Sequence, residues 1–296
     1  MATKHLQNER LRISVSPARG GGLLRFDARR GDEWLPLFRP CADEAGSEPD
    51  QLACYPLVPW SNRIGGGHFG FEGVQYRVPL TRDDEPLPIH GHGWLAHWEV
   101  INVGADEIRL THAWRGADPF SYTASLRYTL EPAALRITLR VGNLGRRLPF
   151  GLGLHPFLPR EPRVRLCAPA RGWWHAGPDH LPDELRRPVP AAYDFARARP
   201  LDDAPPIHHA YAGWSGAARI DFPRARLALE MTADVDHLVI HAPPGRDFFC
   251  VQPVDHPINA LNLPHAQQGG LTVLEAGASL ERHFRFAVGE LEASHG

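Results

Sequence analysis

The chain has 296 residues, of which 43% are hydrophobic, so it carries enough apolar material to build a substantial core. This composition excludes a disordered or collagen-like protein, while the length allows one large domain or two small ones. The formal net charge is -2 and no basic patch or tail occurs, which argues against a nucleic-acid partner. Seventeen histidines stand out, because histidine is the side chain best suited to moving protons near neutral pH.

Cysteine spacing and hydropathy bear on the cellular compartment. The four cysteines are scattered and none forms a C-x-x-C pair, so neither a zinc ribbon nor a thioredoxin-type redox site is expected. No segment has the apolar length of a signal peptide or a membrane span. We therefore expect a reduced, cytoplasmic protein that has no membrane partner.

The predicted elements are almost all strands, because apolar and polar residues alternate along much of the chain. In chain order the alternating runs are 11–15, 74–78, 108–110, 122–130, 135–141, 218–222, 227–231, 238–241, 248–251 and 284–288. The segment Glu131-Pro132-Ala133-Ala134 separates two of these runs and predicts a hairpin turn. Prolines and glycines are spread throughout and would interrupt most helices.

Many short strands with frequent turn signals predict an all-β fold, which at this length is a large antiparallel β-sandwich. Residues 168–206 differ, since they are rich in Pro, Arg, Asp and Ala and show little alternation. Strand patterns of the same type flank this stretch on both sides. We therefore interpret it as a surface excursion within a single domain spanning 1–296, rather than as a linker.

The first segment with chemical potential spans residues 55–67, Tyr-Pro-Leu-Val-Pro-Trp-Ser-Asn-Arg-Ile-Gly-Gly-Gly. Its glycines do not indicate a phosphate loop, because no Gly-Lys-Ser/Thr follows them. Asn62 and Arg63 offer hydrogen-bonding groups beside the flat apolar face of Trp60, which suits a polyhydroxylated ligand. A structural loop with a surface arginine is the simpler alternative.

The second segment is Ile-His-Gly-His-Gly-Trp at 89–94. In an extended chain the side chains of His90 and His92 point the same way, and the neighbouring glycines leave open space above the rings. Such a pair could bind a metal, transfer protons or clamp a ligand. A metal site would need a third ligand, which no local motif supplies. Ordinary surface histidines are the alternative, which the flanking tryptophans weaken.

Two later segments each place one polar residue in an apolar strand. His155 lies in Pro-Phe-Gly-Leu-Gly-Leu-His-Pro-Phe at 149–157, where the glycines permit close approach of a ligand or of another backbone. Its simpler interpretation is a hydrogen-bonded core histidine. Gln252 interrupts an apolar strand in the segment 248–257, just before a proline, either as an interior amide or as a pocket residue. No G-x-S-x-G occurs, so a serine hydrolase is not expected.

Together these segments resemble the aldose 1-epimerase (galactose mutarotase) family, and more closely its hexose-epimerase-like bacterial branch. The motifs that carry the resemblance are Pro-Trp-Ser-Asn-Arg-Ile at 59–64, Ile-His-Gly-His-Gly-Trp at 89–94, Gly-Leu-Gly-Leu-His-Pro-Phe at 151–157 and Cys-Val-Gln-Pro-Val-Asp-His-Pro at 250–257. The resemblance implies a β-supersandwich with a sugar cleft across one sheet. It also implies a small-molecule sugar partner, no metal or cofactor, and a monomer or homodimer.

The resemblance further implies a mechanism in which an acid protonates the sugar's ring oxygen while a base removes the anomeric proton. His155 matches the family's general acid, and His90 matches the histidine that assists at the ring oxygen. Asn62 and Arg63 match contacts to the sugar hydroxyls. His92 is expected to add to this substrate-binding set.

The sequence departs from the family where the base is expected. Gln252 stands where related sequences have glutamate, and an amide is not a base. Ala278 occupies the other glutamate position, and His208 replaces a sugar-contacting aspartate. Glu275, Asp255 or a neutral histidine such as His208 are the candidate replacements.

The sequence therefore leaves three functional hypotheses. The first is an aldose 1-epimerase that acts on a free hexose. The second is a weak or inactive carbohydrate-binding protein that has kept the cleft and lost the base. The third is an epimerase for a hexose 6-phosphate, which would use arginines near the mouth of the cleft.

Overall fold

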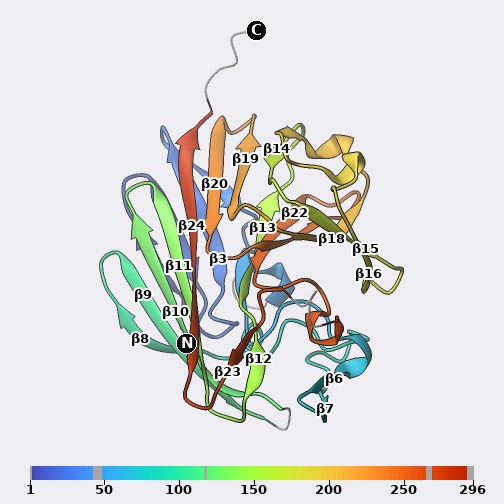
Figure 1. Cartoon of the computed structure of the whole chain (residues 1–296). Helices are drawn as coiled ribbons and strands as arrows, with labels where there is room; N and C mark the ends of the chain where they lie inside the picture. Colours follow the sequence, from blue (N-terminus) through green and yellow to red (C-terminus); the bar gives the residue numbers. More distant parts are fainter. Residues whose placement is uncertain (1, 43–48, 117–118, 265–268, 292–296) are drawn as a thin grey trace.

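The computed structural model describes residues 2–42, 49–116, 119–264 and 269–291 and is built from two large antiparallel β-sheets (Figure 1). Within these residues the helical elements are single 3-10 turns, at Pro49–Gln51, Gly65–Gly67, Ala191–Tyr193, Leu201–Asp203 and Ala260–Asn262. No helix in the described ranges is both long enough and apolar enough to cross a lipid bilayer. The predicted antiparallel all-β sandwich is confirmed.

The larger sheet has eleven strands in the order β1-β2-β3-β5-β13-β22-β21-β18-β15-β16, with β4 paired to β3. Their bounds are β1 Lys4–Gln7, β2 Leu11–Val15, β3 Leu23–Arg30, β4 Glu33–Phe38, β5 Cys54–Leu57, β13 Gly153–Pro159, β15 Gly172–Ala176, β16 Pro182–Arg186, β18 Ile207–Ala212, β21 His237–Ala242 and β22 Phe248–Val254.

The second sheet has nine strands in the order β17-β14-β19-β20-β24-β11-β10-β9-β8. Their bounds are β8 Glu99–Val103, β9 Glu107–Arg115, β10 Ser121–Glu131, β11 Ala134–Asn143, β14 Arg165–Cys167, β17 Arg199–Pro200, β19 Ala217–Phe222, β20 Leu227–Ala233 and β24 Ser279–Glu290. Two two-stranded sheets complete the fold, namely β6 (His68–Phe71) with β7 (Val74–Arg77) and β12 (Leu148–Phe150) with β23 (Thr272–Leu274).

Period-two alternation explains the nine-stranded sheet. Along β10 every second residue is buried, and the exposed positions between them carry polar side chains. Strands β10 and β11 pair in unbroken register up to Glu131 and Ala134, so the loop between them contains only Pro132 and Ala133. The predicted hairpin is therefore confirmed, and the inner face of this sheet packs into the main hydrophobic core.

The eleven-stranded sheet is covered on both faces. One face contributes residues such as Phe26, Leu158 and Ile240 to the main core that the nine-stranded sheet also lines. The other face carries a second apolar cluster that includes Tyr55 and Phe157. Loops cover this second face, and the candidate site lies on it.

Residues 168–206 are more regular than the sequence indicates. Strands β15 and β16 extend the eleven-stranded sheet beyond β18, and β17 pairs with β14 in the other sheet. The interpretation of a plain surface excursion is thus wrong in part. Trp173 and Trp174 are buried within β15, so apolar anchors hold a stretch whose alternation is too short to recognise.

Candidate active site

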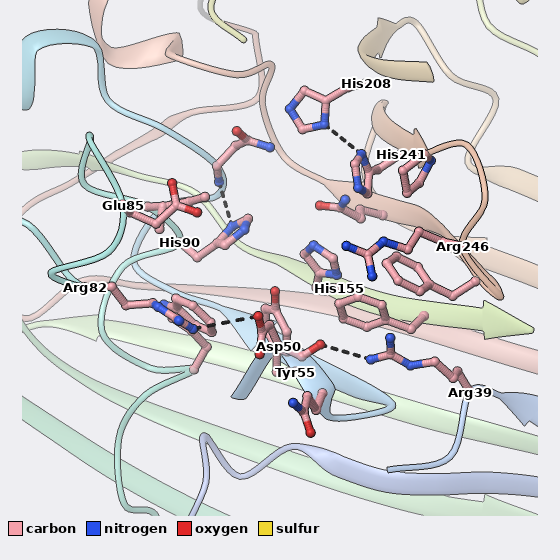
Figure 2. Close-up of a pocket in the computed structure, with 18 of the residues that line it drawn as sticks. Arg39, Asp50, Tyr55, Arg82, Glu85, His90, His155, His208, His241 and Arg246 are labelled. Carbon is pink, nitrogen blue, oxygen red and sulfur yellow. Dashed lines mark hydrogen bonds and ion pairs between the residues drawn. The ribbon is translucent and has the colours of Figure 1, made fainter. Parts of the chain in front are cut away.

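A cavity of about 800 Å³ lies on the loop-covered face of the eleven-stranded sheet (Figure 2). Five neighbouring strands, β5, β13, β22, β21 and β18, form its floor. The floor side chains are Tyr55, His155, Phe157, Phe248, Gln252, His241 and His208. Residues from the connecting segments 39–42, 50–51, 62–63, 82–94, 180 and 243–247 form the walls. The cavity thus combines flat aromatic surfaces with hydrogen-bonding groups.

Strand pairing brings the floor residues together. Tyr55 lies directly opposite His155 across β5 and β13. The register of β13 with β22 on either side of His155 places that residue beside Gln252. One strand further on, His241 on β21 lies directly opposite His208 on β18. Because paired residues project to the same face of a sheet, all these side chains point into one cavity.

His90 enters the cavity from the loop before β8. Its Nδ1 accepts a hydrogen bond of 3.0 Å from the backbone N–H of Asn62, so the neutral ring carries its proton on Nε2. The ring centroids of His90 and His155 are 5.2 Å apart and the rings are nearly perpendicular. Burial lowers the pKa of His90 to about 3, and the positive charge of Arg63 adds to this effect.

His155 is not a hydrogen-bonded core residue. Its ring stacks against Tyr55 and Phe157, each with centroids 4.6 Å away, and its Nδ1 has no hydrogen-bond partner among the described residues. Burial holds the pKa of His155 well below 6.5, with a further contribution from His90. The ring is therefore neutral at pH 7, and its buried Nδ1 can still form a hydrogen bond with a ligand.

Gln252 and the neighbouring histidines make the opposite part of the floor. Gln252 is 2% exposed, and its Oε1 has no partner within the described part of the chain. Nδ1 of His208 lies 3.0 Å from Nδ1 of His241, so one ring donates this hydrogen bond to the other. Burial is the main reason that the pKa values fall to about 2 for His208 and about 4 for His241.

Charged side chains lie around the cavity mouth. Arg63 forms an ion pair of 3.1 Å with Glu85, and Asn62 accepts the backbone N–H of Arg63 through its own side chain. Arg39 lies over the rings of Phe157 and Phe248, at 4.3 and 4.7 Å from their centroids. Asn62 and Arg63 therefore line the cavity wall, and their contact with sugar hydroxyls stays a prediction.

His92 lies away from the cavity, so the expectation that it shares a face with His90 is wrong. His90 has a φ angle of 62° and Gly91 one of 69°, so the backbone is left-handed here and not extended. The His92 ring stacks on Trp114 with centroids 3.9 Å apart. Its assignment to substrate binding therefore has no support from the cavity geometry.

The glycines near the histidines make room for protein and not for a ligand. A Cβ on Gly91 would come within 2.1 Å of the Val58 carbonyl oxygen. A Cβ on Gly151 would come within 2.2 Å of the His256 ring, and one on Gly153 within 2.7 Å of Val254. Close backbone packing, rather than open space above the rings, explains these glycines.

The carboxylates considered as replacement bases lie elsewhere. Asp255 is buried outside the cavity, where it pairs with Arg282 at 2.6 Å. Glu275 is exposed and pairs with Arg147 at 2.7 Å. Ala278 lies just before β24, where its carbonyl oxygen accepts the backbone N–H of Asn143. Only the histidine alternative, His208, lines the cavity.

Sequence reasoning missed His241, Glu85, Tyr55 and His180, all of which line the cavity. His241 lies at the end of the strand that the alternation at 238–241 predicts. Its position opposite His208 could not be predicted, because that requires knowing which strands pair. No group of three or more His, Cys, Asp or Glu side chains in the described ranges is arranged to hold a metal ion.

Comparison with known proteins agrees with this fold. The aldose 1-epimerase family model matches residues 3–287. The uncharacterised protein YphB of Escherichia coli K12 is 32% identical over 285 residues, covering 93% of this chain and 94% of YphB.

Solved structures show the same architecture. An Escherichia coli K12 protein proposed to be an aldose 1-epimerase aligns with a TM-score of 0.89 and 29% identity, covering 98% of this chain and 99% of that one. A GalM/aldose epimerase homologue from Caenorhabditis elegans aligns with a TM-score of 0.85 at 14% identity, covering 98% and 99% of the two chains. The chain belongs to the aldose 1-epimerase family.

Proposed function

We propose that the protein interconverts the α and β anomers of a free hexose in this cavity. The observation that carries the proposal is the pair of perpendicular imidazole rings of His90 and His155, 5.2 Å apart on the cavity wall and floor. Positioned proton transfer by histidine is typically worth about 10²- to 10⁴-fold in rate. The aromatic faces of Tyr55 and Trp94 give the cavity apolar surfaces for a pyranose ring.

In the proposed reaction, the neutral ring of His155 takes a second proton from solvent as the sugar binds and gives that proton to the ring oxygen O5. The C1–O5 bond breaks, its electrons pass to O5, and C1=O1 forms as a base takes the proton of the O1 hydroxyl. His90 donates a hydrogen bond from Nε2 near O5. Rotation about C1–C2 followed by the reverse steps closes the ring on the other face and returns both protons.

A polarimeter tests this proposal. Optical rotation of freshly dissolved α-D-glucose or α-D-galactose should relax faster with the wild-type protein than in buffer, and His155→Ala should remove the acceleration. Quenching of tryptophan fluorescence measures sugar binding in parallel, since Trp94 lines the cavity. Binding without any acceleration would overturn the proposal and favour a carbohydrate-binding protein that Gln252 has made inactive.

A phosphorylated hexose is the second candidate substrate, because arginines gather at the cavity mouth. Arg39 and Arg246 both line the cavity, and no ion pair joins either of them to a carboxylate among the described residues. An arginine fork suits a phosphate dianion. Glucose 6-phosphate should then inhibit glucose mutarotation at concentrations too low for glucose itself to occupy much of the site, and this result would favour the phosphorylated substrate.

A further inference from the structure

The proposed reaction needs a base, and the floor of the cavity holds no carboxylate. The four carboxylates that line the cavity are Asp50, Asp84, Glu85 and Asp247, and none of them lies on a floor strand, since Asp50 is in the 3-10 turn Pro49–Gln51 and the other three are in loops. Glu85 is held by Arg63, and Asp84 by Arg82. The hydrogen bonds from Arg82 lower the pKa of Asp84 and make it a weaker base, and the ion pair with Arg63 occupies the carboxylate of Glu85.

We propose that the linked imidazoles of His208 and His241 supply the base, with His241 taking the anomeric proton and His208 positioning it. This inference rests on the proposed function. It assigns the role of general base, which the amide of Gln252 cannot perform, to two histidines on adjacent strands of the sheet.

Hydrogen bonding within the pair determines where a proton can go. The 3.0 Å contact between the two Nδ1 atoms requires one ring to carry an Nδ1 proton and the other to have a lone pair there. The ring that donates through Nδ1 is therefore the one whose Nε2 is unprotonated. When this Nε2 accepts a proton, the ring becomes an imidazolium that still donates to its neutral partner, which stabilises the new charge.

Burial distinguishes the two rings. Nε2 of His208 is enclosed and has no hydrogen-bond partner in the described ranges, whereas Nε2 of His241 is not among these enclosed atoms. The ring of His180 lies against His208, with centroids 4.6 Å apart, and blocks that side of the pair. His241 is also nearer to the acid, because its strand β21 lies between β18 and the strand that holds Gln252.

The spacing across the sheet suits a pyranose. His155 lies on β13 and His241 on β21, with β22 between them. The register places His155 beside Gln252 and His241 opposite Cys250, so the two histidines are two strand intervals and two residues apart, or about 12 Å between their Cα atoms. This spacing leaves room for a sugar ring with a proton donor on one side and an acceptor on the other. Gln252 lies beside His155 and diagonally across from His241, where its amide can bind a hydroxyl. Figure 2 shows His241 between His208 and His155.

The basicity of His241 also matches the task. Its pKa is lowered to about 4, mainly by burial and further by the charges of His180 and Arg63. An ordinary glutamate has a pKa of about 4.3, so this neutral imidazole is about as basic as the carboxylate that it would replace. The pair also remains uncharged at neutral pH, ready to accept a proton.

Asparagine substitutions test the assignment. His241→Asn keeps an N–H that can donate to His208 but loses the basic nitrogen, so kcat for glucose mutarotation should fall at least about 100-fold with little change in KM. His208→Asn keeps an acceptor for the hydrogen bond from His241, so it should lower kcat by about tenfold or less. His209→Asn is the matched control, because His209 is the next residue on β18 and packs against Trp173, away from the cavity.

Restoring a carboxylate separates loss of the base from loss of the fold. Adding Gln252→Glu to the His241→Asn variant should raise its kcat at least about tenfold. Wild-type catalysis that survives in His241→Asn but disappears in Glu85→Gln would overturn the assignment and leave the proposed function intact. A wild-type rate equal to that of buffer would overturn both.

A measurement on the unmodified protein gives an independent test. Nitrogen-15 NMR of the histidine rings should find His241 protonated at Nδ1 and unprotonated at Nε2. The opposite tautomer of His241 would overturn the assignment even if every variant failed to fold.

Discussion

Polar side chains have different surroundings on the outer face of the nine-stranded sheet and on the cavity floor of the eleven-stranded sheet. On the nine-stranded sheet, Glu131 pairs with Arg136 and Arg285, and Arg219 pairs with Asp221, so charged groups satisfy one another at the surface. On the eleven-stranded sheet, buried polar atoms of His155, His208 and Gln252 have no partner in the described ranges. Each such atom costs about 1–3 kcal/mol of stability.

This difference teaches where function lies in the molecule. Surface polar groups that satisfy one another need nothing further, whereas a cavity floor with unpaired donors and acceptors is completed by a ligand that carries hydroxyl groups. Substitutions on the cavity floor should therefore differ in kind and size of effect from substitutions on the nine-stranded sheet.

The largest effect is expected from the floor of the cavity. His155→Ala should lower kcat for hexose mutarotation about 10²- to 10⁴-fold, because the group that protonates the ring oxygen is lost. His283→Ala is the control on the other sheet, since His283 lies on β24 with half of its side chain exposed. Polarimetry measures the mutarotation rate of both variants. Equal rates for His155→Ala and His283→Ala would contradict the proposed difference between the two sheets.

The next effect concerns the contact that joins the sheets. Asp255 follows β22 and pairs at 2.6 Å with Arg282 of β24, and the Asp255 side chain is only 2% exposed. Arg282→Ala leaves a buried carboxylate without its cation and should cost about 3 kcal/mol of unfolding free energy. Urea denaturation measures this loss, while kcat of the folded protein should stay at the wild-type value. Unchanged stability would show that the ion pair does not hold the sheets together.

Acid should weaken the eleven-stranded sheet through its buried histidines. The pKa values of His90 and His256 are about 3 and about 4 in the folded chain, below the 6.5 of an exposed histidine. Below pH 6.5 the unfolded chain therefore binds protons at these histidines while the folded chain does not. The free energy of unfolding, which is highest above pH 6.5, falls as the pH falls. Each such histidine contributes a slope of about 1.4 kcal/mol per pH unit.

Asp255 acts in the opposite direction, because burial raises its pKa to about 6 and its protonation favours the folded chain as the pH falls. One group cannot cancel several buried histidines, so the net slope should remain. Urea midpoints at pH 7, 6 and 5 give the measurement. A constant midpoint would mean that these rings are charged or solvated in the folded protein.

The smallest effect is expected on the outer face of the nine-stranded sheet. Arg219 pairs with Asp221 and Glu230, but its side chain is 42% exposed. Arg219→Gln should therefore cost less than about 1 kcal/mol, and added salt should reduce the difference further. Thermal unfolding at low and high salt checks this expectation. A loss of unfolding free energy as large as that expected for Arg282→Ala would mean that exposed ion pairs also contribute substantially to the stability of the fold.

Local patterns predicted much of the fold because strand alternation records which face is buried. The hairpin at Glu131 and Ala134 required only two adjacent alternating runs and a proline. Strands β15 to β17 were not predicted, since they are too short for alternation to be visible and depend on their pairing partners.

The site was predictable only where a residue's role does not depend on backbone geometry. His155 and His90 were found through their motifs, and both line the cavity. The error at His92 arose from the left-handed conformation of His90, which turns the following residues away. His241 was missed because it becomes chemically significant only when pairing places it against His208.

The central claim is that ring nitrogens in this cavity move protons to and from a sugar. Proton exchange spectroscopy on an equilibrated hexose tests it directly, since it reports magnetisation transfer between the α and β anomeric protons without any initial mixing. We predict exchange signals that grow with the concentration of wild-type protein and vanish with His155→Ala. Saturating sugar binding with exchange no faster than in buffer would contradict the account.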